Sequence, residues 1–215
     1  CIFDNNAVAA RFAVEKFGVS RIFILDWDAH HGNGLQDIFY RDNQVLYVSL
    51  HQYPHYPGSG GYQEVGNGEG EGYTINFPLP PRSGEEVYIA AFEQVILPVA
   101  RQYQPELILI SAGYDGHFSD PLCSMLLTSG SFARMTSMLK ELASNLCSGR
   151  IMAALEGGYN LMGVAASICN TIAVLAGEDM RLTEEDQPST SWSSSERGME
   201  IVEATKSALS PYWSL

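Results

Sequence analysis

Cysteine is scarce in this chain of 215 residues, and its four copies are widely scattered with no C-x-x-C pair: Cys1, Cys123, Cys147 and Cys169. This spacing does not suit the disulfide framework that holds small secreted domains together. In a chain of this length such cysteines are typical of reduced, mostly buried thiols, so we expect a cytoplasmic protein.

Basic residues are also few, with 12 Lys and Arg against 25 Asp and Glu and a formal net charge of -13. Because no basic run is present, we expect no direct binding to nucleic acid. Apolar runs are short as well. None approaches the roughly 20 residues of a membrane-spanning helix, and no signal peptide is visible. We therefore expect no membrane partner.

What the chain does contain is enough apolar material, 46% of its residues, for one substantial core. Continuous apolar runs predict buried strands at 22–25, 45–50, 107–111 and 151–155, and helical periodicity predicts helices at 6–17, 85–103, 132–146 and 162–176. Ser83 and Glu86 form a capping-box pattern, Gly18 suits a helix end, and Pro98 should kink or split its helix. Continuous strands that alternate with helices predict an α/β fold with a parallel sheet covered on both faces.

The most informative segment, residues 26–34 (DWDAHHGNG), follows the first predicted strand directly. In an extended chain Asp26, Asp28 and His30 would project from one face. Two carboxylates and an imidazole at the end of a buried strand need a partner of opposite charge, and mixed nitrogen and oxygen ligands favour zinc or a similar first-row ion. The alternative is a strand end that frays into a solvated polar loop.

Further candidates follow the other predicted strands, where sites of parallel α/β sheets form. Asp115, in the small-residue segment 111–117 (SAGYDGH), is the favoured third metal ligand. Asp120 is the alternative, although Asp120-Pro121 is typical of a turn. Tyr159 follows two glycines and could donate its hydroxyl to a developing oxyanion. The alternative for Tyr159 is a ring packed beneath a glycine turn.

Three ordered blocks, residues 26–34, 111–122 and 155–160 (LEGGYN), resemble signature motifs of the zinc-dependent histone deacetylase family. That family includes bacterial acetoin-utilisation-type and acetylpolyamine deacetylases. The resemblance runs from Cys1 to about residue 177, and the third block is more similar to the class II and bacterial branch than to class I. It implies an arginase-like three-layer α/β fold with a central parallel sheet of eight strands. It also implies hydrolysis of an acetyl amide, in acetyl-lysine of a protein or in a small acetylated amine, to acetate and a free amine.

The resemblance also implies roles for individual residues. The ligands of zinc, or of iron(II) as the alternative, would be Asp28, His30 and Asp115, and Tyr159 would polarise the acetyl carbonyl. A structural potassium ion would be bound by Asp26, Asp28, His30, Ser49 and Leu50, partly through backbone carbonyls. The substrate tunnel would be formed by Tyr56, Leu122, Gly157 and Gly158. Leu122 favours acyl-lysine, because the polyamine-selective branch carries Glu at the matching position.

The sequence departs from the family pattern at its beginning. The family's adjacent catalytic histidines, general base and general acid, lie just upstream of the segment that matches residues 1–6. His30-His31 is no substitute, because His30 matches the metal ligand. The family's first strands are missing too, and the chain begins without Met. We therefore expect the C-terminal part of a longer deacetylase that hydrolyses poorly by itself.

Within this part we expect a truncated catalytic domain at residues 1–180, a Ser-rich linker at 181–196 and a C-terminal helix and tail at 197–215. Three other functions stay open. They are an acetylpolyamine amidohydrolase, a metal-binding fragment without catalysis, and an arginase-like hydrolase with two manganese ions. The last needs more metal-facing carboxylates than the three blocks supply. The sequence does not indicate an oligomeric state.

Overall fold

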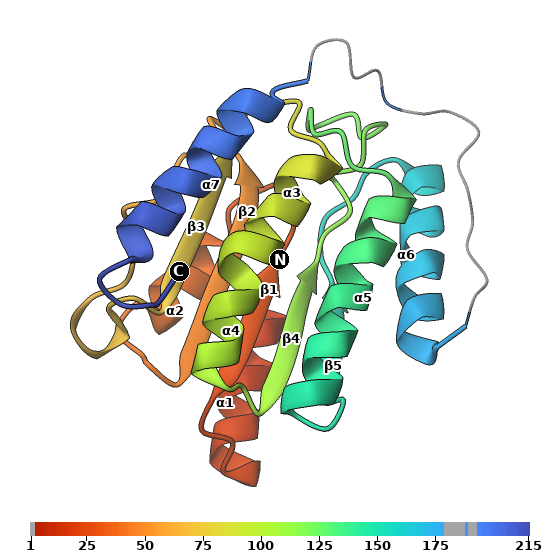
Figure 1. Cartoon of the computed structure of the whole chain (residues 1–215). Helices are drawn as coiled ribbons and strands as arrows, with labels where there is room; N and C mark the ends of the chain where they lie inside the picture. Colours follow the sequence, from red (N-terminus) through yellow and green to blue (C-terminus); the bar gives the residue numbers. More distant parts are fainter. Residues whose placement is uncertain (1–2, 179–187, 189–192) are drawn as a thin grey trace.

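A five-stranded sheet, with all neighbouring strands parallel in the order β3-β2-β1-β4-β5, forms the centre of the computed structural model (Figure 1). The model describes residues 3–178, 188 and 193–215. Its strands are β1 (Ile22–Asp26), β2 (Val45–Gln52), β3 (Thr74–Leu79), β4 (Leu107–Ala112) and β5 (Ile151–Leu155). The predicted parallel α/β architecture is confirmed. The described residues contain five strands, whereas the family resemblance implied eight.

Helices cover both faces of this sheet (Figure 1). They are α1 (Asn5–Phe17), α2 (Asn33–Phe39), α3 (Glu85–Ala91), α4 (Leu97–Tyr103), α5 (Ser129–Leu146), α6 (Leu161–Ala176) and α7 (Ser195–Leu209). α3, α4, α5 and α7 contribute to the larger apolar cluster on one face, and α1 and α2 to the smaller cluster on the other. α6 packs beside α5.

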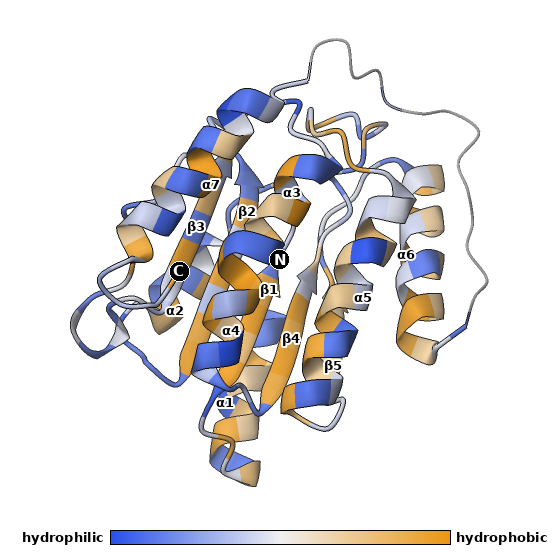
Figure 2. Ribbon diagram, viewed as in Figure 1, coloured by the Kyte–Doolittle hydropathy of each residue, from blue (hydrophilic) through white to orange (hydrophobic). Residues whose placement is uncertain are grey.

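The alternation of side chains along β1 explains the two clusters. Phe23 and Leu25 belong to the larger one, and Ile22 and Ile24 to the smaller one, and all four are fully buried. A strand buried on both faces reads as a continuous apolar run, which is why β1 could be predicted from the sequence. Figure 2 shows the same apolar character along β4.

Two elements and one cap differ from the predictions. β3 was not expected, because Asn76 and Pro78 interrupt its apolar pattern, and α2 is too short to show a helical period. The predicted capping box is wrong. Gly84 is the N-cap of α3, and the Ser83 hydroxyl donates instead to the Pro80 carbonyl at 2.8 Å.

Two other predicted features of the helices are confirmed. Residues 85–103 stay helical throughout, but a π-helical turn, Phe92–Ile96, just before Pro98 interrupts the α-helical hydrogen bonding there. Gly18 ends α1 with a left-handed φ of 67°.

The C-terminal part of the chain returns to the sheet. α7 contacts α3 and β3, and the Thr205 hydroxyl donates to the Asn76 carbonyl at 3.0 Å. Trp213 Nε1–H donates to the Gly72 carbonyl at 2.8 Å. Most of the predicted Ser-rich linker at 181–196 lies outside the described residues.

β5 forms one edge of the described sheet and is much less covered than the other strands. Met152 and Leu155 are 43% and 57% exposed, whereas β1 and β2 are buried along their full length. None of the described helices is both long and apolar enough to cross a membrane.

Candidate metal centre

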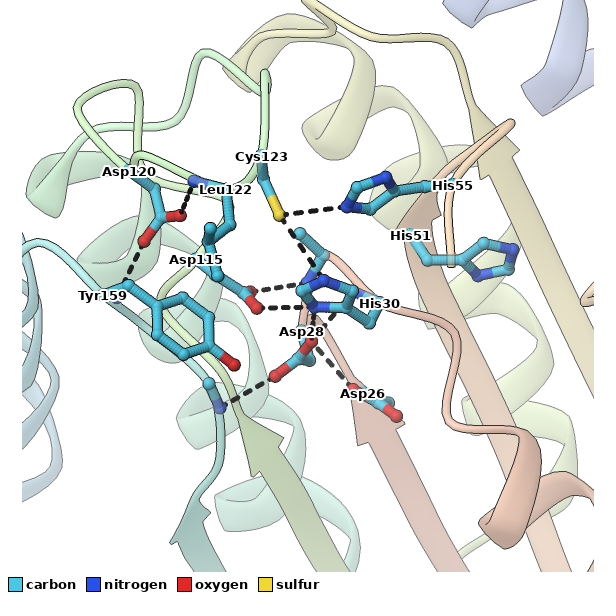
Figure 3. Close-up of polar contacts among 12 residues, drawn as sticks. Asp26, Asp28, His30, His51, His55, Asp115, Asp120, Leu122, Cys123 and Tyr159 are labelled. Carbon is cyan, nitrogen blue, oxygen red and sulfur yellow. Dashed lines mark hydrogen bonds and ion pairs between the residues drawn. The ribbon is translucent and has the colours of Figure 1, made fainter. Parts of the chain in front are cut away.

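The carboxyl ends of β1, β2 and β4 lie side by side, because Asp26 is in register with both Ser49 and Ser111. Segments that leave these strands therefore start from the same edge of the sheet. Residues 27–31 and 113–117 meet above this edge (Figure 3).

Asp28, His30 and Asp115, the three predicted metal ligands, lie together at this edge. His30 Nδ1 is 3.1 Å from Asp28 Oδ1 and 2.8 Å from Asp115 Oδ2. One ligand atom of each residue lies within 4.8 Å of the others, a spacing that a single ion can bridge. The Asp115 side chain is fully buried, whereas Asp28 and His30 keep 14% and 24% of their side-chain surface exposed.

The turn after β1 gives these side chains their positions. Asp26 Oδ1 accepts the Asp28 N–H at 3.1 Å, and Asp28 Oδ1 accepts the His30 N–H at 2.8 Å. The Ala29 N–H donates to Asp115 Oδ1 at 2.7 Å. Strand alternation therefore ends at Asp26, contrary to the expectation of one shared face. The other oxygen of Asp26 accepts the Tyr47 hydroxyl at 3.1 Å.

Glycines let the backbone approach the two carboxylates. The Gly157 N–H donates to Asp28 Oδ2 at 2.9 Å, and a Cβ at Gly157 would stand 2.5 Å from Asp115 Oδ2 and 2.7 Å from Asp28 Oδ2. A Cβ at Gly113 would also collide with Asp28. Any side chain at either glycine would therefore fill the space beside the ligands.

The electrostatics of the three residues fit a bound cation. Hydrogen bonds to Asp115 and Asp28 raise the pKa of His30 to about 12. Burial raises the pKa of Asp115 to about 6. Burial also acts to raise the pKa of Asp28, but the hydrogen bonds of Asp28, chiefly those with His30, together outweigh it, so the pKa of Asp28 is lowered. Two adjacent carboxylates shielded from water are favourable only with a positive partner. A set of two oxygen donors and one nitrogen donor with an open side suits a catalytic zinc or iron ion.

Tyr159 stands at the margin of this cluster, half-exposed, with its ring directed toward Asp28 and Asp115 (Figure 3). Its backbone N–H donates to Asp120 Oδ2 at 2.8 Å, and Asp120 Oδ1 accepts the Leu122 N–H at 2.9 Å. Asp120 therefore fixes the backbone of Tyr159 and Leu122, and it lies outside the described groups that could hold a metal. From the sequence, Asp120 is either the alternative third ligand or part of a turn, and the structure groups Asp115 with Asp28 and His30 instead.

Comparison with known proteins decides the family. Residues 1–175 match the model of the histone deacetylase domain. The chain belongs to the histone deacetylase family.

Histone deacetylases and related amidohydrolases are among its relatives. A probable deacetylase of Archaeoglobus fulgidus is 41% identical over 221 residues, which cover 99% of this chain and 61% of that protein. The human polyamine deacetylase HDAC10 is 38% identical over 220 residues, or 99% of this chain and 31% of the relative. The crystal structure of the HDA15 HD domain superposes with a TM-score of 0.86 at 39% identity, over 99% of this chain and 56% of that one. The chain spans about half the length of the curated relatives that it matches.

The predicted tunnel residues of this histone deacetylase chain come from three loops. Tyr56, after β2, is 78% exposed, and Leu122, after β4, is 54% exposed. Gly157 and Gly158 follow β5, and Gly158 adopts a φ of 137°, which side chains with a Cβ rarely adopt. Large exposed apolar and aromatic side chains beside a polar centre are suited to contact an aliphatic substrate chain.

The residues of the predicted potassium site come from the end of β1, the turn after it, and β2. Asp26 and Ser49 are buried, and burial, followed by repulsion from Asp28, raises the pKa of Asp26 well above its usual range. The Ser49 hydroxyl lies 2.9 Å from His51 Nδ1. The Leu50 side chain is buried in the core, so Leu50 could bind an ion only through its backbone carbonyl. The potassium site stays a prediction.

Two residues beside the cluster were not predicted. His55 stacks on His30 with ring centroids 4.9 Å apart, and its Nε2 lies 3.6 Å from Cys123 Sγ. Neither residue belongs to a periodic pattern. The only signal was the unusual composition of the loop after β2, rich in Gly, Tyr and Pro.

Proposed function

We propose that this histone deacetylase chain binds one zinc ion, with iron(II) as the alternative, through Asp28, His30 and Asp115, and that it contributes this centre to hydrolysis of an acetyl amide. The supporting observation is the convergence of these three side chains, with Tyr159 beside them, at the carboxyl edge of the parallel sheet. Such an ion supplies Lewis-acid polarisation of a carbonyl and lowers the pKa of a bound water.

The residues around the ligands have defined tasks in this proposal. The N–H groups of Ala29 and Gly157 donate to Asp115 and Asp28, which fixes the direction of each carboxylate. The Tyr159 hydroxyl donates to the acetyl oxygen as negative charge develops there. Burial, and next the charge of Asp115, raise the pKa of Tyr159, so the hydroxyl keeps its proton at neutral pH.

Proton transfer is the weak step of the proposed reaction in this chain. The sequence has five histidines, and its one adjacent pair is His30-His31. His30 is assigned to the metal and His31 bonds to Ser59 and Gln36, so neither serves as general base. General acid–base catalysis contributes a factor of about 10² to 10⁴ in rate. We expect turnover by the 215-residue chain to be slower, by a factor of this order, than turnover with a general acid and a general base in place.

Acyl-lysine is the proposed substrate. Tyr56 and Leu122 present aromatic and apolar surface suited to the methylene chain of lysine, and Leu122 carries no charge that would select a cationic polyamine. The alternative is an acetylated polyamine. One relative, the human polyamine deacetylase, favours it.

Metal analysis together with a hydrolysis assay tests the proposal. The chain is loaded with zinc, dialysed, and analysed for metal content, and its turnover of an acetyl-lysine peptide is compared with that of acetylspermidine. We expect one zinc per chain to stay bound after dialysis, and slow but zinc-dependent release of acetate, faster from the peptide. Asp115→Asn should lose both, whereas the exposed Asp37→Asn should keep both. An Asp115→Asn chain that keeps both its zinc and its release of acetate would overturn the ligand assignment.

A further inference from the structure

A thiol and a second imidazole lie beside the ring nitrogen of His30 that faces away from Asp28 and Asp115. Cys123 Sγ is 3.9 Å from His30 Nε2 and 3.6 Å from His55 Nε2 (Figure 3). All three ligand atoms lie within 4.8 Å of one another. His30 thus has a carboxylate pair at one ring nitrogen and a thiol–imidazole pair at the other.

The distances match those around a single tetrahedral ion. Bond lengths of about 2.3 Å to sulfur and 2.05 Å to nitrogen place the two ligand atoms about 3.6 Å apart. The two sulfur–nitrogen distances therefore already suit ligand positions, and the stacked His55 ring would have to turn so that its Nε2 faces the ion.

The surrounding chain holds the thiol and the second imidazole in place. Asp120 accepts the Leu122 N–H on one side of Cys123, and Gln52 Oε1 accepts the Ser124 N–H at 2.7 Å on the other. Cys123 is buried, with 7% of its surface exposed. His55 stacks on His30 at an interplanar angle of 29° and is partly open to solvent, which leaves a path for an ion to enter.

We propose that Cys123, His55 and His30 Nε2 form a second metal site, selective for a thiophilic ion such as Zn²⁺ or Cd²⁺. Thiolate and imidazole ligands select these ions over Mg²⁺ and Ca²⁺, which prefer oxygen. Binding releases the thiol proton of Cys123 and the proton of His30 Nε2 to solvent. The site itself does not depend on the proposed function.

Its consequence rests on the proposed function, because the two sites share the imidazole of His30. An ion at Nε2 would make His30 a bridge between two cations, and the repulsion between these cations opposes metal binding at Nδ1. It also occupies space beside Leu122, at the proposed substrate tunnel. Excess Zn²⁺ or Cd²⁺ should therefore inhibit the enzyme.

A cadmium titration followed by ultraviolet thiolate-to-metal absorption tests the site in the zinc-loaded chain. We expect one equivalent of Cd²⁺ to produce the band in the wild type and in Cys169→Ser, the matched control at an exposed cysteine. Cys123→Ser should lose the band. His55→Phe keeps a stacking ring without nitrogen ligands and should weaken Cd²⁺ binding at least about tenfold.

The outcomes separate the two proposals. A band that persists in Cys123→Ser, or an affinity unchanged in His55→Phe, overturns the second site whatever the zinc content. A chain that binds no zinc through Asp28 and Asp115 but shows the band dependent on Cys123 and His55 overturns the proposed function and leaves the second site standing.

Discussion

His30 and His31 are neighbours in the sequence but belong to two different polar clusters. His30 lies between two carboxylates, which raise its pKa to about 12. His31 bonds to the neutral side chains of Ser59 and Gln36, and burial lowers its pKa although the charges of Glu64 and Asp37 act in the opposite direction. One cluster therefore attracts a cation, and the other keeps its imidazole neutral.

The cluster around His31 is a hydrogen-bond network in which the Glu64 carboxylate accepts the Gln36 Nε2–H. His31 Nε2 lies 3.1 Å from Gln36 Oε1, which also accepts Asn76 Nδ2–H at 2.7 Å, so Nε2 carries the proton of His31. His31 Nδ1 then accepts the Ser59 hydroxyl at 2.8 Å. This network anchors the loop that carries His55 and Tyr56. His31 shows that burial alone does not make a metal site, because none of its described hydrogen bonds is to a carboxylate.

The largest effect should be the difference in zinc affinity between a variant of His30 and a variant of His31. His30→Asn removes a ligand and should lower zinc affinity by more than about 100-fold, beyond the 10- to 100-fold typical of residues that only support a ligand. His31→Asn is the matched variant and should keep most of the affinity. Chelator competition measures both. Equal losses would mean that the two clusters do not differ as described.

Tyr159 should affect turnover without affecting the metal. Tyr159→Phe removes the donor to the acetyl oxygen and should lower kcat by about 10² to 10³. Zinc content should stay at the wild-type level. Tyr62→Phe, in the loop after β2, serves as the control and should leave kcat unchanged. If Tyr159→Phe lost zinc while kcat per bound zinc stayed unchanged, the assigned role of Tyr159 as a donor to the acetyl oxygen would be wrong.

Gln36 should affect stability without affecting the metal. Gln36→Leu leaves His31 and Asn76 without their shared acceptor and should lower the free energy of unfolding by about 1–3 kcal/mol. Denaturant titration measures this change, with Asp37→Asn as a control on the same helix. An unchanged midpoint would show that the network is replaceable.

The smallest effect concerns the pH dependence of stability. Burial, followed by repulsion from His31 whenever that ring is protonated, lowers the pKa of His51 to about 3, so the unfolded chain binds more protons than the folded one between pH 3 and 6.5. Stability should therefore fall as the pH falls, by about 1 kcal/mol between pH 6.5 and 5.5. His51→Gln should lose this part of the slope in denaturant titrations at several pH values. A slope identical to that of the wild type would show that His51 is protonated in the folded chain.

Most of the fold could be predicted from local pattern. β1, β2, β4 and β5 were found because strands of a covered parallel sheet are continuously apolar, and four helices by their period. β3 was missed, since Asn76 and Pro78 are accepted there only through tertiary contacts: the Asn76 side chain bonds to Gln36 and its carbonyl accepts the Thr205 hydroxyl.

For the candidate site, the sequence by itself determined the chemical types, two aspartates, a histidine and a glycine-flanked tyrosine, and their places after strands. Only the tertiary structure decided that Asp120 fixes the Tyr159 backbone, that Asp26 turns toward Tyr47, and that Cys123 and His55 lie beside His30. The physical reason is that strand periodicity holds only to Asp26. Beyond it the direction of each side chain is set by hydrogen bonds between segments as far apart as Asp28 and Gly157, which no local pattern encodes.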